Sequence, residues 1–384
     1  MSATDITSYG GHCKLDQLPV ELVVQIMLES HSLSTLYSLI CASARLASVF
    51  RGSAVEITKG VMQRTVPAQM RIFLRAVIQL RSSPFPLILN AGLAKQSTRL
   101  CSHLGCTPAS TPEILRSFIC LAHRIHVLAH ECIDHYRRVC IAMNPSCLDD
   151  PTFRGYDGTL VVQTVRPRGK PYQPKDTGPP SWAEEQLVLL NLWRVQYYYE
   201  IRVAHQAGRL EWPAVTPDEL LSMDIAQFYG REMSSWRWEQ LITIMIYMQQ
   251  VKSSKQGTSR PFCLPSPSAP GRFDWPCSPE PLIDPLDEQA SRLDFRSDAF
   301  IFMSLMSNDL KGSPLFGFRP SNFRKFGFVL WERRRMVDLG LLSPKTRLPD
   351  FTYYFKWVSI LSEEERDRKN ADHAFIDRVL SAMV

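Results

Sequence analysis

Most of the residues in the segment 15–29, LDQLPVELVVQIMLE, are hydrophobic. The polar interruptions at Glu21, Gln25 and Glu29 fall four residues apart, so on a helix at about 100° per residue they form one stripe of roughly 80°. A strand would need polar and apolar residues to alternate, and they do not. The segment therefore predicts a helix that begins at Pro19 and carries about 280° of apolar surface. That width is enough for one face towards its own domain and another towards a partner.

Two more short helices are predicted directly after this one, each with apolar residues at i, i+3 and i+4. Their apolar positions are Leu36, Leu39 and Ile40, and then Leu46, Val49 and Phe50. Three short helices supply little core, so they must pack on the rest of the chain, on a partner, or on both. We therefore expect a three-helix module at 14–52, preceded by a disordered N-terminus at 1–13.

Helical periodicity continues through most of residues 53–384, so the fold class is predicted to be all-α, with a helical body after the module. Three pairs have the spacing of a capping box, in which a Ser or Thr and a Glu satisfy the first turn of a helix: Ser181 with Glu184, Thr216 with Glu219, and Ser362 with Glu365. Thr111-Pro112 is a further start signal. The predicted helices are 53–64, 67–82, 111–143, 181–208, 217–229, 235–251, 292–310, 327–341, 353–366 and 370–383.

Two proline-rich stretches, 144–180 and 252–286, are predicted to be loops, because their prolines are too frequent for a helix or a central strand. The segment 157–166, DGTLVVQTVR, is the best candidate for a strand. We find no internal repeat with a period of 20 to 50 residues.

The amino-acid composition and charge of the chain argue against nucleic acids and membranes as partners. The chain has 384 residues, of which 45% are hydrophobic, and a net charge of +6 from 44 basic and 38 acidic residues. The densest basic run is only Arg333, Arg334 and Arg335, expected on the exposed side of a helix, so no nucleic acid is predicted as a partner. Ten irregularly spaced cysteines favour reduced thiols. No signal peptide or apolar run of membrane length is present, so we expect no membrane association and a cytoplasmic or nuclear protein.

The histidine-rich segment 123–135, HRIHVLAHECIDH, looks like a metal site but does not fit one. HECIDH is one residue longer than the zinc-protease motif HExxH, and this places His130 and His135 about 140° apart on a helix. His126 and His130 have the required spacing of four, yet further ligands would have to come from elsewhere. The opposite side of this helix is a continuous apolar stripe, so the histidines are expected on a solvated face. We predict no metal, no cofactor and no catalytic residues, since phosphate-binding and nucleophile motifs are absent too.

Seven residues of the predicted module match the pattern of the F-box, and residues 14–52 resemble the F-box-like proteins of fungi that carry an unclassified helical C-terminal region. The matching positions are Leu18, Pro19, Glu21, Ile26, Leu36, Leu39 and Cys41. Many members of the family have a Trp in the third helix, and this sequence has none there. The resemblance covers about a tenth of the chain.

The resemblance implies a protein that recognises substrates for an SCF-type (Skp, cullin, F-box) E3 ubiquitin ligase and does not itself catalyse a reaction. Its partners would be the Skp-family adaptor, through it the cullin, and an unknown protein substrate. The residues that face the adaptor would be Leu18, Pro19, Leu22, Ile26, Leu36 and Leu39. Two alternatives stay open: an α-helical scaffold unconnected to ubiquitin, in which 14–52 is the first part of one large α-domain, and an enzyme with an unrecognised site.

Overall fold

The protein is mainly α-helical, as the periodicity predicts. A computed structural model describes residues 14–83, 87–88, 110–150, 168–211, 216–229, 233–254, 263–267, 297–308, 315, 318–345 and 351–366. The predicted disordered segment 1–13, the strand candidate 157–166 and the last predicted helix, 370–383, lie outside these residues. None of the described helices is both long enough and apolar enough to cross a membrane.

The chain divides into two compact units. Unit 1 comprises Met1–Val127 and Trp193–Tyr229, and unit 2 comprises Leu128–Leu192 and Gly230–Val384. Two long helices, α8 (Pro112–Ala142) and α9 (Trp182–Gln206), contribute residues to both units.

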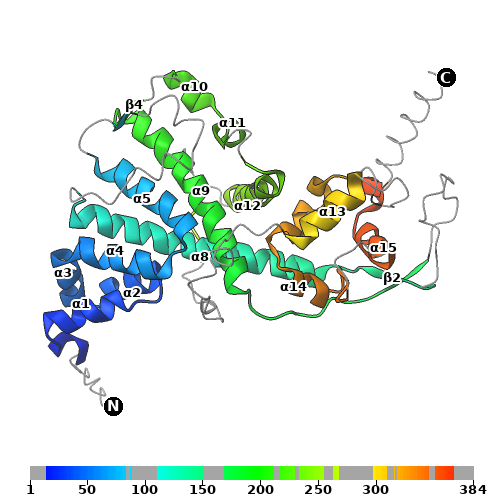
Figure 1. Cartoon of the computed structure of the whole chain (residues 1–384), viewed down its shortest axis with the longest axis horizontal. Helices are drawn as coiled ribbons and strands as arrows, with labels where there is room; N and C mark the ends of the chain where they lie inside the picture. Colours follow the sequence, from blue (N-terminus) through cyan, green and yellow to red (C-terminus); the bar gives the residue numbers. More distant parts are fainter. Residues whose placement is uncertain are drawn as a thin grey trace, which may run out of the picture. The chain divides into compact units, whose positions relative to one another are not determined.

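Unit 1 begins with the three predicted short helices and a fourth that packs against them (Figure 1). After a 3-10 turn at Lys14–Gln17, these helices are α1 (Val20–Leu28), α2 (Leu33–Ala42), α3 (Ala44–Gly52) and α4 (Ala54–Thr65). Pro19 lies one position before the helix that we expected it to begin. At Gly60 of α4 a Cβ atom would lie 2.5 Å from Leu28 Cδ2, so α1 and α4 approach closely because that residue has no side chain.

Side-chain hydrogen bonds cap the N-terminal ends of α2 and α3. Ser32 and Ser43 lie just before α2 and α3, and each hydroxyl accepts a hydrogen bond from a backbone N–H of the first turn, at 3.0 and 3.1 Å. Such caps satisfy donors that have no partner within the helix. Buried apolar side chains then hold α1 to α4 together, among them Val23, Met27, Leu36, Ile40, Phe50 and Ile57.

The rest of unit 1 consists of α5 (Ala68–Ser82), the first half of α8, the second half of α9, α10 (Pro217–Ser222) and α11 (Ile225–Tyr229). A short parallel pairing joins β1 (Leu87–Ile88) to β4 (Leu210–Glu211). We expected one helix over 217–229, but a second one begins after Asp224. The reason is local, since the Asp224 carboxylate accepts from the Gln227 N–H at 2.7 Å and the Gln227 side chain accepts from the Asp224 N–H at 2.9 Å.

Unit 2 contains the remaining halves of α8 and α9 and a set of helices from the C-terminal part of the chain. These are α12 (Ser235–Ser254), α13 (Asp298–Asn308), the 3-10 helices η3 (Pro320–Phe326) and η4 (Phe328–Leu330), α14 (Arg333–Asp338) and α15 (Phe351–Ser359). Aromatic rings fill their core: Trp357 contacts Phe328 and Phe302 at centroid distances of 4.8 and 5.0 Å. Such pairs stabilise a core beyond the area that they bury.

Two expectations for unit 2 need correction. The segment 144–180 is not all loop, because β2 (Ser146–Leu148) pairs antiparallel with β3 (Gly169–Pro171). The helix expected at 327–341 is divided into η4 and the short α14, because Trp331 and Glu332 between them are extended, with ψ angles of 140° and 157°. Gly340, with a positive φ of 75°, follows soon after α14. The helix expected at 292–310 is confirmed at Asp298–Asn308, and residues 292–296, 309 and 310 lie outside the described residues.

Candidate functional site

Helix α1 has two apolar faces, and one of them is uncovered. Val23 and Met27 are buried, at 1% and 0% exposure, whereas Val20, Leu22 and Ile26 are 51%, 50% and 36% exposed. Leaving such side chains in water forgoes part of the roughly 1.5 to 3 kcal/mol that each would gain on burial. Contiguous exposed apolar residues of this kind mark interaction sites more often than isolated ones do.

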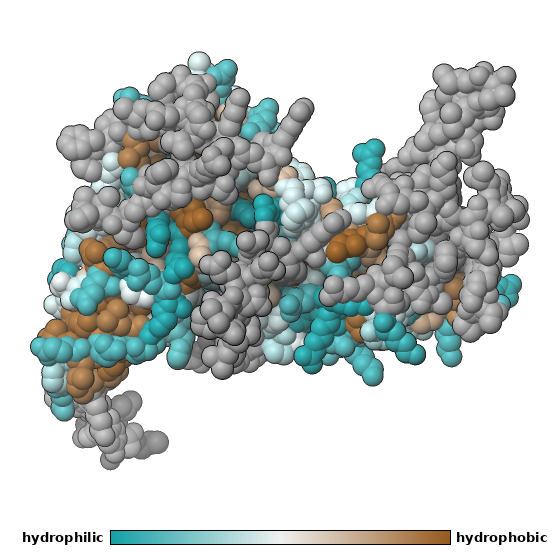
Figure 2. Space-filling view, viewed as in Figure 1, coloured by the Kyte–Doolittle hydropathy of each residue, from teal (hydrophilic) through white to brown (hydrophobic). Residues whose placement is uncertain are grey.

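We define the α1 surface as Val20, Leu22 and Ile26, together with exposed Pro19 and half-exposed Leu18. Figure 2 shows hydrophobic surface over the N-terminal helices, in the part of the molecule where Figure 1 places α1. Glu21, Gln25 and Glu29 form the predicted polar stripe beside it, and all three are exposed.

Two arginine side chains hold the ends of α1. At its start, Arg45 of α3 donates to the Leu18 carbonyl. At its end, Arg64 of α4 donates to the carbonyls of Leu28 and of Ser30, the latter at 3.1 Å, and pairs with the Glu29 carboxylate. The last carbonyls of a helix have no partner within it, and a cation there also interacts favourably with the helix dipole. The α1 surface is therefore fixed in position by its own unit.

Of the six residues expected to face an adaptor, four lie on the α1 surface: Leu18, Pro19, Leu22 and Ile26. The other two, Leu36 and Leu39 of α2, are less exposed than Leu22. Leu36 is completely buried inside the module and has no area to offer a partner in this conformation, and Leu39 is half-exposed. The reason is that α2 is packed against α3 and α4 with its Leu33, Leu36, Ile40 stripe inward. Leu36 supports the module from within.

Helix α2 also contacts the first half of α8 through His123. The Tyr37 ring stacks on the His123 ring at a centroid distance of 4.4 Å, and Ser34 Oγ is hydrogen-bonded to His123 Nδ1 at 2.8 Å. Burial lowers the pKa of His123 below its usual value. The three-helix module is therefore attached to the helical body by specific side chains, and nothing in the sequence pattern identified His123 as their partner.

The expectation that the histidines of α8 face solvent is wrong at His130. His130 is buried, and its Nε2 lies 3.0 Å from Oε1 of Glu185, which is buried as well. His135 is half-buried, and its ring is 5.3 Å from that of Tyr247. Glu185 is the residue that sequence reasoning missed here, because it lies 55 positions away from His130.

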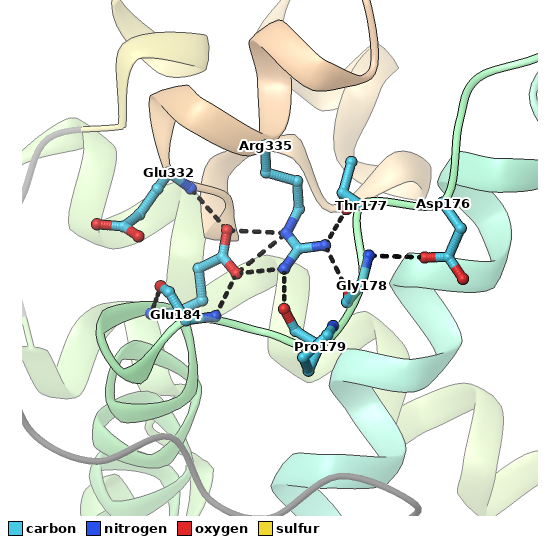
Figure 3. Close-up of polar contacts among 8 residues, drawn as sticks. Asp176, Thr177, Gly178, Pro179, Glu184, Glu332 and Arg335 are labelled. Carbon is cyan, nitrogen blue, oxygen red and sulfur yellow. Dashed lines mark hydrogen bonds and ion pairs between the residues drawn. The ribbon is translucent and has the colours of Figure 1, made fainter.

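A second buried charged group lies in unit 2. We predicted that Arg333 to Arg335 would lie on the exposed side of a helix, but one of these three residues is buried. Arg335 is only 7% exposed, and its guanidinium donates to both carboxylate oxygens of Glu184, at 2.9 to 3.0 Å (Figure 3). The same guanidinium donates to the carbonyls of Gly178 and Pro179, at 3.2 and 2.7 Å, and to the Thr177 hydroxyl. Our prediction for Arg335 was therefore wrong, while Arg334 is exposed as expected.

The Glu184 carboxylate connects three segments of unit 2. It accepts from the Ser181 N–H at 2.9 Å, which completes the predicted capping box of α9, and from the Glu332 N–H at 3.0 Å at the start of α14. Together with Arg335 it joins the segment 177–181, the first turn of α9 and α14. These partners account for the donors of Arg335, so this cluster is best explained as a structural cross-link.

No protein family, no curated protein and no solved structure matches this chain. Its function must therefore be argued from the α1 surface and from the residue pattern of 14–52.

Proposed function

We propose that the chain is an F-box-like protein that recruits a protein substrate to an SCF-type E3 ubiquitin ligase. In this proposal the α1 surface binds the Skp-family adaptor, and the adaptor connects the chain to the cullin. The helical body binds the substrate. The chain contributes proximity and no bond chemistry, because holding two proteins together raises the effective concentration of one near the other.

The observation that carries the proposal is the uncovered face of α1. If α4 or the body had buried Leu22 and Ile26, most of the apolar surface of this helix would be lost to an adaptor. Instead the opposite face, with Val23 and Met27, is the one that packs inward. The hydrogen bonds from Arg45 and Arg64 to the ends of α1 support the proposal further, since a preorganised surface loses less conformational entropy on binding.

Binding of the purified full-length protein to a purified Skp-family adaptor tests the proposal, with isothermal titration calorimetry as the readout. Leu22→Asp combined with Ile26→Asp should abolish binding, because two carboxylates would have to be desolvated in an apolar interface. Both side chains are exposed, so the double variant should keep the helical circular dichroism of the wild type.

The matched control is Val203→Asp on α9, which also places a carboxylate at an exposed apolar position, 37% accessible and outside α1. It should bind the adaptor as the wild type does. Absence of binding by the folded wild-type protein would refute the adaptor role and favour an α-helical scaffold unconnected to ubiquitin. Binding that survives the double variant would refute the assignment of the α1 surface.

A further inference from the structure

Three side chains that can bind a metal ion converge from α8 and the first turn of α9. They are His126, His130 and Glu185, and one possible ligand atom from each lies within 4.8 Å of the other two. The shortest printed separation among them, 3.0 Å, joins His130 Nε2 to Glu185 Oε1. From the sequence we predicted no metal, because ligands beyond the two histidines would have to come from elsewhere. In the structure, Glu185 comes from elsewhere in the chain to join them.

The local structure of both helices positions the three side chains. His126 and His130 are four residues apart on the continuous helix α8, so they lie one above the other on the same face. The first turn of α9 is fixed by the capping box of Ser181 and Glu184, and Glu185 is the next residue. Because the backbone at each ligand is already ordered, binding an ion would require little more than side-chain rotation.

We propose that His126, His130 and Glu185 bind one zinc ion, which cross-links α8 to the first turn of α9. Two imidazole nitrogens and one carboxylate oxygen are ligands that Zn²⁺ takes in proteins, and three protein ligands leave its fourth position for water. With bonds of about 2.1 Å, the ligand atoms of a tetrahedral site lie about 3.4 Å apart. The separations in this cluster are near that value, so small changes in side-chain torsion complete the site.

The ion takes the place of a proton. The hydrogen bond between His130 Nε2 and Glu185 Oε1 holds one proton between these two atoms. Zinc binds an imidazole nitrogen that carries no proton and a carboxylate that is ionised, so the proton leaves Nε2 when the ion arrives. Both atoms thereby exchange one positive partner for another of higher charge.

Burial favours a cation at this place. Glu185 is 1% exposed and His130 is 3% exposed, and the attraction between an ion and a carboxylate is stronger in such an interior than in water. The neighbouring carboxylate of Glu184 is likewise buried and is paired with the guanidinium of Arg335. A zinc ion supplies positive charge to Glu185 as Arg335 does to Glu184. His126 is only half-buried, so the ion and its water reach solvent on that side.

The experiment uses the full-length protein without a histidine tag, stripped of metal with EDTA, incubated with zinc and separated from unbound zinc on a desalting column. We expect one zinc per chain by plasma mass spectrometry. Cobalt(II) in place of zinc should give the intense visible absorption of a tetrahedral ion, without the near-ultraviolet band of a thiolate ligand. Failure of the folded protein to retain zinc would overturn the proposal. A thiolate band would overturn it as well, because the ion would then be held by cysteines.

Three glutamine variants test the assignment of the ligands, with zinc affinity measured by competition with a chromophoric chelator. His126→Gln and Glu185→Gln should each weaken binding by more than about 100-fold, since even the loss of a group that only contacts a ligand costs about 10- to 100-fold. His135→Gln is the matched control. His135 is also a half-buried histidine of α8, but it lies outside the cluster, so this variant should bind zinc as the wild type does.

Wild-type affinity in either His126→Gln or Glu185→Gln would refute the assignment, as would equal weakening in His135→Gln. Circular dichroism shows whether each variant keeps its helices. If Glu185→Gln fails to fold, His126→Gln decides the question, because its side chain is only half-buried and its replacement should be tolerated. The readout is the metal content of the chain, so it is independent of whether the α1 surface binds an adaptor.

Discussion

Replacing Arg335 by Met should destabilise unit 2 strongly, because it removes one partner of a buried ion pair. Glu184 is 1% exposed, and in the variant its carboxylate would stay buried without the guanidinium. The Met side chain is of similar length and apolar, so the loss comes from the missing charge and hydrogen bonds and not from a large cavity. The carbonyls of Gly178 and Pro179 and the Thr177 hydroxyl would lose a donor as well.

The size of the effect follows from these contacts. Breaking a buried ion pair by removing one partner costs about 3 to 5 kcal/mol. Glu184 would keep two backbone donors, the Ser181 N–H and the Glu332 N–H, which argues for the lower end, about 3 kcal/mol. A loss of this size is a large fraction of the ~5 to 15 kcal/mol by which a folded protein is usually stable. It corresponds to a roughly 100-fold change in an opening equilibrium.

Hydrogen exchange measured by mass spectrometry locates the effect. Amides in α14 and in the first turn of α9 should lose roughly 100-fold in protection in Arg335→Met, because the cross-link between these segments is gone. Arg334→Met is the matched control, since Arg334 lies beside it and is exposed, and it should change stability by no more than about 0.5 kcal/mol. Equal protection in the two variants would refute the assignment of Arg335 as a cross-link.

Two further predictions concern a glycine and a capping box. Gly327→Ala should lower the melting temperature more than Gly208→Ala, although both glycines have a φ of 66°. At Gly327 the new Cβ atom would lie 2.6 Å from the Tyr136 ring, whereas at Gly208 nothing lies within 4 Å of it. Equal losses in melting temperature would contradict this steric explanation. The pKa of the Glu219 carboxyl is lowered by hydrogen bonds from the backbone and side chain of Thr216, so the capping box should stabilise α10 at neutral pH and cease to do so as the pH falls through that lowered pKa. Thr216→Ala should raise the pKa of Glu219 in an NMR titration, and an unchanged value would show that the side-chain bond has no effect.

Local chemistry explains what could be predicted from the sequence. The capping pairs at Ser181, Thr216 and Ser362 all form, and in each the Ser or Thr hydroxyl accepts from the Glu N–H while the Glu carboxylate accepts in return. The broad apolar surface of α1 was also evident, because the positions of Glu21 and Gln25 on a helix follow from the helical period alone. Such features depend on residues within one or two turns of each other.

What the sequence could not predict depends on partners far away in the chain. Arg335 is buried because Glu184 lies 151 residues earlier, and His130 is buried because of Glu185. A charged residue on a helix is usually solvated, so periodicity alone assigns both to the surface. The inward position of Leu36 has the same cause, since only the packing of α2 against α3 and α4 decides which of its apolar residues remain accessible.

The hydrogen bonds from Arg45 and Arg64 to the ends of α1 also determine how the α1 surface can be studied. With nine residues, α1 is shorter than the 12 to 15 that an isolated helix needs to be even marginally stable in water. A synthetic peptide with this sequence would lack Arg45 and Arg64 and would be mostly unfolded. A fragment ending shortly after α3 would lack Arg64, Gly60 and the His123 ring on which Tyr37 stacks. The adaptor binding that we propose for this short helix would therefore be a property of the folded unit, and the motif alone should not transfer it.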